Sequence, residues 1–200
     1  PAFEGDFEGI QMHAHSYLSP FEPYDFRGKN IVVVGMGNSA MDIASELSQK
    51  PIAKNLWVAA RRGVYVMPKY IGGQVADKAS LPTWIPLWAQ RKLAAMAIKR
   101  AVGNMEDYGL PKFLTRVGCG DIKMKPNIER FEGTQVRFTD GTAEDVDIIV
   151  YATGYNVEFP FFDPDFLSAK DNHLPLFKRA IRPDLPNLLF MGLAQPLPTL

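Results

Sequence analysis

Two glycines separated by one residue, Gly35 and Gly37, directly follow the apolar run Ile31–Val34. At the end of a strand, the first glycine permits a tight turn into a helix, and the second lets the backbone approach a phosphate with no Cβ in the way. Ala40 then stands where the helix must pack closely on the strand. The pattern predicts a site for the pyrophosphate of a dinucleotide, held by the N–H groups and the positive dipole end of the helix.

Asn38 and Ser39 occupy the first turn of this predicted helix. Side-chain oxygens at that place cap N–H groups and also reach phosphate. We therefore expect Asn38 to contact the ligand directly, and Ser39 either to contact it or only to cap the helix. Asp42 and Glu46 follow four residues apart, which is typical of a solvated helix face.

Two arginines, Arg61 and Arg62, end the next apolar run, Leu56–Ala60. Here an NAD site places a carboxylate for the ribose 2′-hydroxyl, whereas an NADP site needs cations for the 2′-phosphate. No acidic residue lies between Asn55 and Tyr65, and a guanidinium matches a phosphate with two parallel hydrogen bonds. The predicted cofactor is NADP(H), with Arg61 as the direct contact. The alternative is that both arginines belong to a solvated turn.

The elements that must position these residues form a β-α-β unit. Between the two apolar runs, apolar residues recur at helical spacing, at Met41, Ile43, Ala44 and Leu47. The predicted fold class is α/β, a Rossmann-like dinucleotide-binding domain with a helical insertion at about residues 68–118. The insertion carries an apolar stripe at helical spacing, made of Trp84, Leu87, Ala94, Ala95, Ile98 and Val102. This stripe packs on its own domain, lies on a membrane surface or is covered by self-association into a homo-oligomer.

After the insertion, Thr134–Phe138 and Val146–Val150 flank the turn signal Asp140-Gly141. This arrangement predicts a small hairpin-like element that leads back into the parallel sheet. Pro160, Pro164, Pro175, Pro183 and Pro186 then punctuate a tail that is predicted to have little regular structure.

Composition excludes several classes of function. The 200 residues are 46% hydrophobic, enough for a core, and Lys+Arg and Asp+Glu balance at 22 each. Balanced charge gives no long-range field that would recruit nucleic acid or an anionic membrane, and no apolar run is long enough to span a bilayer. The single cysteine, Cys119, excludes an internal disulfide and a cysteine-based metal cluster, and it fits a reducing, cytoplasmic compartment.

Four motifs resemble those of one family, the flavin-containing monooxygenases. The family fingerprint F-x-G-x-x-x-H-x-x-x-(Y/F) stands here as FEGIQMHAHSY, with Phe7, Gly9, His13 and Tyr17 in place. The glycine turn GMGNSA with MDIASELS, the linker VYATGY at 150–155 and the strand PNLLFMGLAQP at 186–196 are similar to family motifs in the same order. Tyr17-Leu18 departs from the related Baeyer-Villiger monooxygenases, which usually carry Trp there, followed by Pro or Asp.

The resemblance implies an enzyme with two cofactors. In the family, NADPH reduces FAD, and the reduced flavin uses O₂ to oxygenate a soft nitrogen or sulfur atom of a small-molecule substrate. The linker motif lies between the two dinucleotide domains, which implies that Thr153, Gly154 and Tyr155 lie near the cofactor. The family's active-site Asn belongs to a region with no counterpart here, so no catalytic residue is assigned. His13 and His15 are not expected to bind a metal ion, because no Cys or carboxylate stands near them at metal-ligand spacing. His13 is instead expected to hold the linker through hydrogen bonds of its ring.

The chain contains one glycine turn, at Gly35, whereas the family's FAD-binding domain carries a second. We therefore expect residues 1–27 to be a linker with the fingerprint and residues 28–154 to be the NADP-binding domain. Residues 155–200 are expected to be a loop-rich return segment toward an FAD domain that is missing from this chain. Such a chain by itself is expected to bind NADP(H) without turnover.

Three classes of function stay open on the sequence. The first is a fragment of an FAD- and NADPH-dependent monooxygenase, with the Baeyer-Villiger type as a variant. The second is a separate NADP-binding module that works with another flavoprotein subunit. The third is a nucleotide-binding fold retained only for interaction, and the intact glycine turn with its two arginines argues against it.

Overall fold

The computed structural model describes residues 3–62, 70–71, 74–75, 84–86, 88–90, 92–93, 96, 112–163, 166, 174, 176–185 and 187–193. The chain divides into two compact units. The first comprises Pro1–Gly73 and Leu81–Gly154, and the second comprises Gln74–Ser80 and Tyr155–Leu200.

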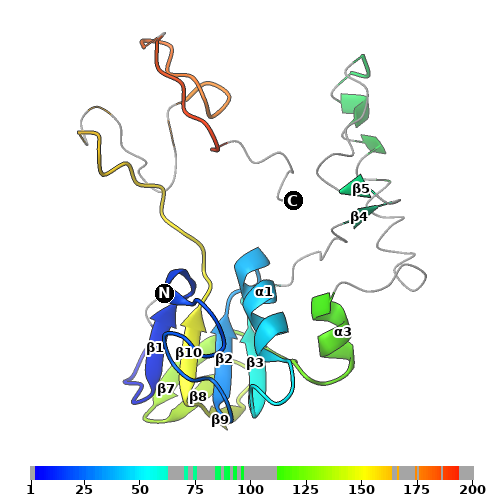
Figure 1. Cartoon of the computed structure of the whole chain (residues 1–200), viewed down its shortest axis with the longest axis vertical. Helices are drawn as coiled ribbons and strands as arrows, with labels where there is room; N and C mark the ends of the chain where they lie inside the picture. The colour runs from blue at the N-terminus through cyan, green and yellow to red at the C-terminus, as the bar shows by residue number, and fades with distance from the viewer. Residues whose placement is uncertain are drawn as a thin grey trace. The chain divides into compact units, whose positions relative to one another are not determined.

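Five parallel strands form the centre of the first unit (Figure 1). In spatial order they are β1 (Ile10–His13), β10 (Ile148–Tyr151), β2 (Asn30–Val34), β3 (Asn55–Ala59) and β6 (Lys123–Lys125). Val34 at the end of β2 lies beside Tyr151 of β10 and Ala59 of β3, so the carboxyl ends of these strands share one edge. The α/β class with a parallel sheet is confirmed.

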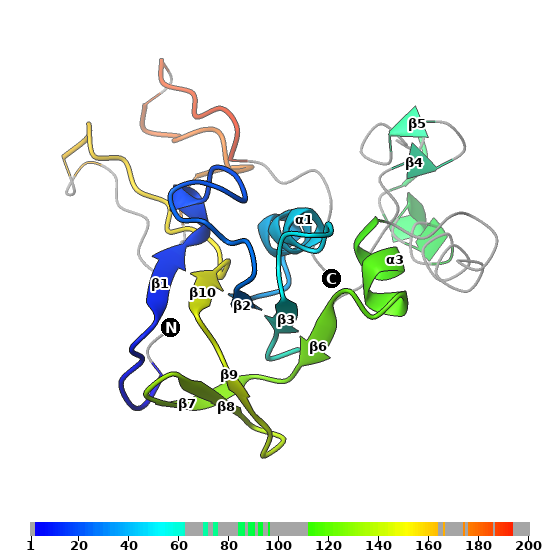
Figure 2. The ribbon, with the colours of Figure 1, turned by 60° about the horizontal axis from the view of Figure 1, so that its bottom comes forward.

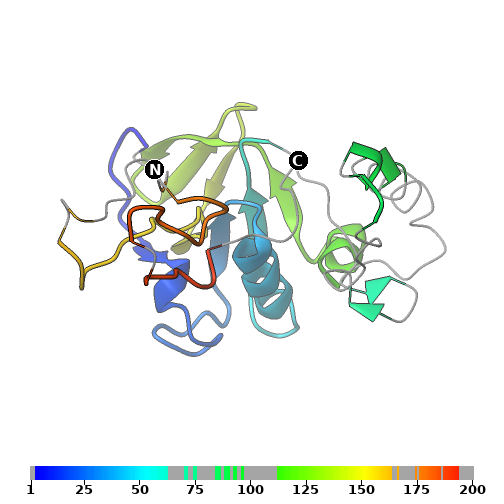
Figure 3. The ribbon, with the colours of Figure 1, turned by 90° about the horizontal axis from the view of Figure 1, so that it is seen from above.

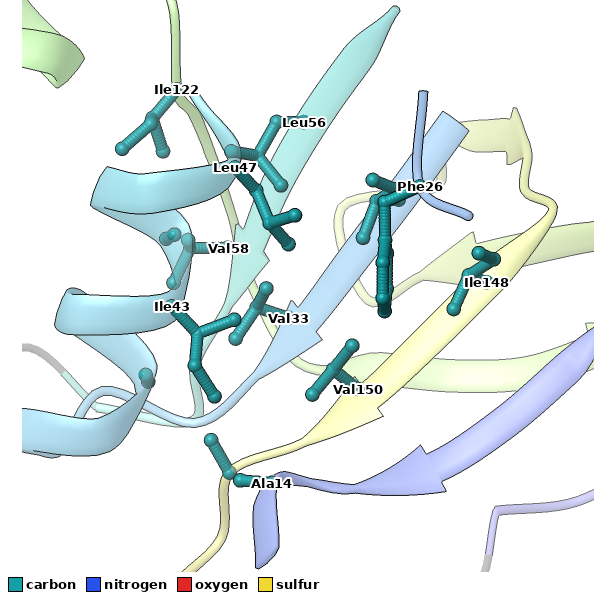
Figure 4. Close-up of a cluster of buried hydrophobic side chains, with 14 of the residues drawn as sticks. Ala14, Phe26, Val33, Ile43, Leu47, Leu56, Val58, Ile122, Ile148 and Val150 are labelled. Atoms are coloured by element: carbon teal, nitrogen blue, oxygen red, sulfur yellow. The ribbon is translucent and has the colours of Figure 1, made fainter. Parts of the chain in front are cut away.

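Helices cover one face of this sheet (Figure 2). They are α1 (Asn38–Leu47) and α3 (Lys112–Gly118), and a short 3-10 turn, η1 (Ala14–Ser16), follows β1. Ile43 and Leu47 point from α1 toward Val33 and Val58 of the sheet (Figure 4). The helical spacing of apolar residues after the glycine turn thus serves to bury one stripe of α1.

A three-stranded antiparallel sheet covers the other face (Figures 2 and 3). Its strands are β7 (Ile128–Glu132), β8 (Gln135–Phe138) and β9 (Ala143–Asp145). Along β2, Ile31 and Val33 join the core beneath the helices, whereas Val32 and Val34 join the core beneath the antiparallel sheet. Because both faces are buried, the strand is an unbroken apolar run rather than an alternating one.

The predicted hairpin is correct at its turn and wrong in its second arm. Asp140-Gly141 lies between β8 and β9, which pair antiparallel. The partner arm is Ala143–Asp145, whereas Ile148–Val150 belongs to β10 of the parallel sheet. Ile148–Val150 is fully buried, which suits a strand covered on both faces, and Ala143–Asp145 is short and partly solvated.

The segment between β3 and α3 contains the short strands β4 (Tyr70–Ile71) and β5 (Gln74–Val75). Of the predicted apolar stripe, Trp84 is described and is 82% exposed. Leu87, Ala94, Ala95, Ile98 and Val102 lie outside the described residues, so the helical insertion stays a prediction. In the part of the chain that the structure describes, every helix is too short or too polar to cross a bilayer.

The second unit is organised by aromatic rings. Phe159, Phe161, Phe162, Phe166 and Phe190 contact one another with ring centroids 4.8–6.3 Å apart. The phenylalanines of the tail therefore contact one another within the second unit. Among the described residues after Tyr151 there are isolated bridges, such as Phe177 with Ile181, but no helix or strand.

Candidate functional site

The order of the parallel strands locates the candidate site. From β2 the chain proceeds to β3 and β6 on one side, whereas β10 and β1 lie on the other side. Open α/β sheets bind ligands outside the strand carboxyl ends, at the point where the strand order changes direction in this way. The candidate site is therefore the edge formed by the residues that follow β2, β3 and β10.

Gly35 makes the turn that leaves β2. Its φ is +121°, a conformation that residues with a side chain rarely adopt. Its N–H donates to the Ala59 carbonyl of β3 at 2.8 Å, and a Cβ built on it would overlap the Ala152 carbonyl oxygen after β10. Gly35 is thus required by the fold, because it brings the ends of three strands together.

Gly37 is the N-cap of α1, and the fold makes no comparable demand on it. Its φ of −84° is open to any residue, and a Cβ built there would meet nothing within 4 Å. Gly37 provides no side-chain cap to the first turn of the helix. The backbone is therefore approachable at the place where the sequence predicts a phosphate.

The other residues of the turn divide into exposed and buried positions. Asn38 is exposed, Ser39 is half-buried and Ala40 is completely buried against the sheet. Asn38 and Ser39 lie in the first turn of α1, as predicted, but the N-cap position belongs to Gly37, so the alternative in which Ser39 is the N-cap does not apply. Ala40 fills the small-residue position in the packing of helix on strand.

Arg61 and Arg62 follow β3, and both are exposed. Neither makes an ion pair with any residue that the structure describes. The other described arginines of the first unit, by contrast, all pair with a carboxylate: Arg27, Arg116, Arg130 and Arg137. Two uncompensated guanidinium groups therefore lie after the strand to which the Gly35 turn is bonded.

Thr153 and Gly154 follow β10 at the same edge. The Ala152 N–H donates to the Val34 carbonyl at 2.8 Å, and the backbone nitrogen of Thr153 would lie 3.5 Å from a Cβ on Gly35. Thr153 and Gly154 are exposed. Tyr155 is 57% exposed and begins the second unit.

The fingerprint residues fasten the amino-terminal segment to the first unit. Phe7 contacts the ring of Phe131 in the antiparallel sheet with centroids 5.4 Å apart. A Cβ on Gly9 would lie 2.6 Å from the Asp147 carbonyl oxygen, so only glycine fits there.

His13 and Tyr17 continue this fastening toward the candidate site and toward α1. His13 Nε2 lies 3.1 Å from the Gly154 carbonyl oxygen, which agrees with the expected structural role. The Tyr17 hydroxyl donates to Glu46 at 3.1 Å; burial and the Glu46 carboxylate raise the pKa of that hydroxyl. Glu46 is therefore not simply part of a solvated face. In the sequence, only the position of Tyr17 within the fingerprint motif could have pointed to a structural role for this tyrosine, and its bond to Glu46 was not predicted.

The structure thus brings nine of the predicted site residues to the edge formed by the three strand ends of the first unit. They are Gly35, Gly37, Asn38, Ser39, Ala40, Arg61, Arg62, Thr153 and Gly154. Ala152 is a residue that sequence reasoning missed, since its carbonyl acts through the backbone. Among the described residues, no three His, Cys, Asp or Glu side chains gather as a metal site would require.

Known proteins with this arrangement define a class. The chain matches the flavin-binding monooxygenase-like family over residues 1–78 and 92–200, and it belongs to that family. It is 34% identical to flavin-containing monooxygenase 3 of Canis lupus familiaris over 220 residues, which cover 96% of this chain and 40% of that protein. It is 36% identical to dimethylaniline monooxygenase (N-oxide-forming) 2 of Mus musculus, covering 96% and 39%. The chain therefore spans about 40% of the length of these relatives.

Solved structures agree on the fold. S-allyl-L-cysteine S-oxygenase of Allium sativum matches 96% of this chain and 35% of its own, with a TM-score of 0.58 and 25% identity. The flavin-containing monooxygenase of Stenotrophomonas maltophilia matches 94% of this chain over 48% of its own, with a TM-score of 0.63 and 19% identity. A cyclohexanone monooxygenase from Rhodococcus sp., solved with NADP⁺, matches 78% of this chain over 45% of its own, with a TM-score of 0.52 and 14% identity. The resemblance seen in the four motifs is confirmed.

Proposed function

We propose that this chain is the NADP(H)-binding portion of an FAD-dependent monooxygenase that transfers one oxygen atom from O₂ to a soft nitrogen or sulfur centre. One observation carries the proposal. A single edge of the sheet carries both an N-cap glycine that the fold does not need and two arginines that no described carboxylate neutralises. Both features suit a ligand with a pyrophosphate and a further phosphate.

The residues at the edge fit a dinucleotide group by group. Gly37 and the first-turn N–H groups of α1 would hold the pyrophosphate, and Asn38 would reach it from the exposed side. Arg61 would bind the 2′-phosphate with its guanidinium fork, with Arg62 adding charge beside it. Thr153, Gly154 and Tyr155 would lie toward the nicotinamide end, and bound NADPH would supply a hydride for reduction of the flavin.

The division of the protein follows from the same proposal. Residues 1–27 would serve as the linker that carries the fingerprint, residues 28–154 as the NADP-binding domain and residues 155–200 as a return segment. FAD would be bound mainly by a domain outside these 200 residues, which is consistent with a chain that spans about 40% of its relatives.

The oxygenated atom is inferred from two relatives. The mouse relative, 36% identical, is named for N-oxide formation, and the garlic structure, 25% identical, is named for S-oxygenation. Tyr17-Leu18 also differs from the fingerprint of Baeyer-Villiger enzymes. A tertiary amine or a thioether is therefore the substrate class we propose.

Binding is tested by titrating the purified protein with NADP⁺ and with NAD⁺ in a calorimeter. We expect NADP⁺ to bind at least about tenfold more tightly, because only it carries the phosphate that Arg61 would hold. Equal affinities would overturn the role given to the arginines. Failure of both to bind would overturn the site itself.

Oxygenation is tested on the intact protein with FAD and NADPH. We expect an N-oxide from a tertiary amine or a sulfoxide from a thioether, each identified by mass spectrometry together with NADPH consumption. Conversion of a cyclic ketone to a lactone, with no product from the amine or the thioether, would favour the Baeyer-Villiger variant instead.

A further inference from the structure

His13 holds a defined tautomer by virtue of two contacts. As the N-cap of η1, its Nδ1 accepts a hydrogen bond from the His15 N–H at 3.1 Å. A ring nitrogen that accepts in this way carries no proton, so the ring proton lies on Nε2. Nε2–H therefore donates to the Gly154 carbonyl oxygen, which is 3.1 Å away.

The partner of His13 is a backbone group of the candidate site. In the register of the sheet, His13 lies beside Tyr151, so its side chain can reach the loop Ala152–Gly154 that leaves β10. Gly154 has a φ of +96°, and a Cβ there would meet nothing within 4 Å. The hydrogen bond from His13 is thus a fixed point for a stretch of backbone whose own conformation is permissive.

That loop is in contact with the glycine turn. Ala152 donates to Val34 at 2.8 Å, and its carbonyl packs against Gly35 so closely that no side chain fits between them. The position of the Ala152–Gly154 backbone therefore limits where the Gly35–Gly37 turn can lie. A chain of contacts runs from His13 through Gly154 to the residues proposed to bind the pyrophosphate.

We propose that His13 is a positioning residue for dinucleotide binding, which it supports through the Gly154 carbonyl without touching the ligand. This inference rests on the proposed function. It differs from a general role in holding the amino-terminal segment, because Phe7, Gly9 and Tyr17 fasten the same segment to other elements. Among the contacts described for the fingerprint residues, the one that reaches the edge of the site is the hydrogen bond from His13 to Gly154.

Two substitutions at this position separate its two bonds. The amide of His13→Asn places its oxygen near Nδ1 and keeps the cap on η1, but it is too short to reach Gly154. The longer amide of His13→Gln places an N–H donor near Nε2 and restores the bond to Gly154. Tyr17→Phe is the matched control, because it removes the bond to Glu46 on α1 and leaves the Gly154 contact in place.

The intact protein and these three variants are titrated with NADP⁺. We expect His13→Asn to weaken NADP⁺ binding about five- to tenfold, His13→Gln to stay within about threefold of the unmodified protein and Tyr17→Phe within about twofold. Unchanged affinity in His13→Asn, no rescue by His13→Gln, or an equal loss in Tyr17→Phe would each overturn the positioning role.

Amide hydrogen exchange of residues 152–154 without ligand gives a second readout. His13→Asn should speed exchange there, and His13→Gln and Tyr17→Phe should not, because only the first frees the Gly154 carbonyl. If the unmodified protein fails to bind NADP⁺, the proposed function fails, and the exchange rates still decide whether His13 holds the loop. Equal rates in all four proteins would refute the mechanical step itself.

Discussion

Arginines occur in two contrasting surroundings in the first unit. On the antiparallel sheet, Arg130 and Arg137 both hydrogen-bond to Glu132, at 2.8 Å and 3.0 Å. At the end of β3, Arg61 and Arg62 are exposed and form no ion pair with the described residues. The same side chain is neutralised in one region and uncompensated in the other.

The contrast separates residues that the fold uses from residues that it does not. Glu132 lies between two guanidinium groups, so the charges of the antiparallel sheet are balanced within the chain. At the strand ends no described carboxylate balances Arg61 and Arg62, and the neighbouring turn contains Gly37, which has open space beside it. The fold gives no reason for a glycine at position 37 or for arginines at positions 61 and 62, and we therefore assign these residues to ligand binding.

The largest effect is expected at Gly35, which the fold uses although it lies in the candidate site. Gly35→Ala combines a φ of +121° with overlap on the Ala152 carbonyl and should lower the free energy of unfolding by on the order of 3 kcal/mol. Gly120→Ala is the matched control, since its φ of +79° is strained but its surroundings are open, and it should cost only about 1 kcal/mol. Denaturant unfolding measures both. Equal losses would show that contact with Ala152 does not matter.

Arg61→Ala tests the uncompensated side of the comparison. We expect a loss of about 10- to 100-fold in NADPH affinity, with NADH affinity unchanged, because the guanidinium would contact only the 2′-phosphate. The free energy of unfolding should change by less than about 0.5 kcal/mol, since Arg61 forms no ion pair with the described residues that the substitution would remove. Cofactor titration and denaturant unfolding are both needed.

Arg137→Ala is the control from the balanced side. It removes a bond to Glu132, so thermal stability should fall slightly, and affinity for NADPH should not change. If Arg137→Ala weakened NADPH binding as much as Arg61→Ala, the division into structural and ligand-binding arginines would be wrong.

The sequence predicts the centre of the sheet better than its margins. Ile31–Val34 and Leu56–Ala59 are recognisable because strands buried on both faces are continuously apolar. The edge strand Lys123–Lys125 carries two lysines and is largely exposed, so no apolar pattern marks it. The extent of the hairpin after Asp140-Gly141 depends on which neighbour Ile148–Val150 joins, and that is a long-range choice.

The candidate site is predictable in its positions and less so in its details. The glycine turn and the two arginines are local patterns, and the fold brings them to one edge. The N-cap fell on Gly37 rather than on Asn38 or Ser39 because the extended backbone continues through Gly37, with ψ at 179°. That no described carboxylate pairs with Arg61 or Arg62 depends on where residues remote in sequence lie, so a local pattern could not predict it.

Gly37→Ser should have an intermediate effect, and it should change the stability of the fold and the affinity for the cofactors in opposite directions. Serine is at least as good an N-cap as glycine, so stability should be kept or raised by a few tenths of a kcal/mol. Its hydroxyl would occupy the first-turn N–H groups that the pyrophosphate needs, so affinity for NADPH and NADH should fall together, by about tenfold. Thermal unfolding and titration with both cofactors distinguish this result from the selective loss expected in Arg61→Ala. Unchanged binding of both cofactors would mean that the pyrophosphate does not lie at Gly37.

The smallest effect concerns the balanced charges and depends on pH. Hydrogen bonds from Arg137 and then Arg130 lower the pKa of Glu132 below its ordinary value of 4.5. A carboxyl whose pKa is lower in the folded state stabilises the fold above its unfolded pKa, and this contribution is lost as the pH falls through the folded pKa.

Glu132→Gln should therefore lower the melting temperature slightly at pH 7, and the difference from the unmodified protein should shrink as the pH falls below 4.5. Added salt should also reduce this difference in melting temperature, because the Arg137–Glu132 pair is partly exposed. A difference that persisted at low pH would mean that Glu132 acts through packing, and the charge balance of the antiparallel sheet would then not explain why its arginines differ from Arg61.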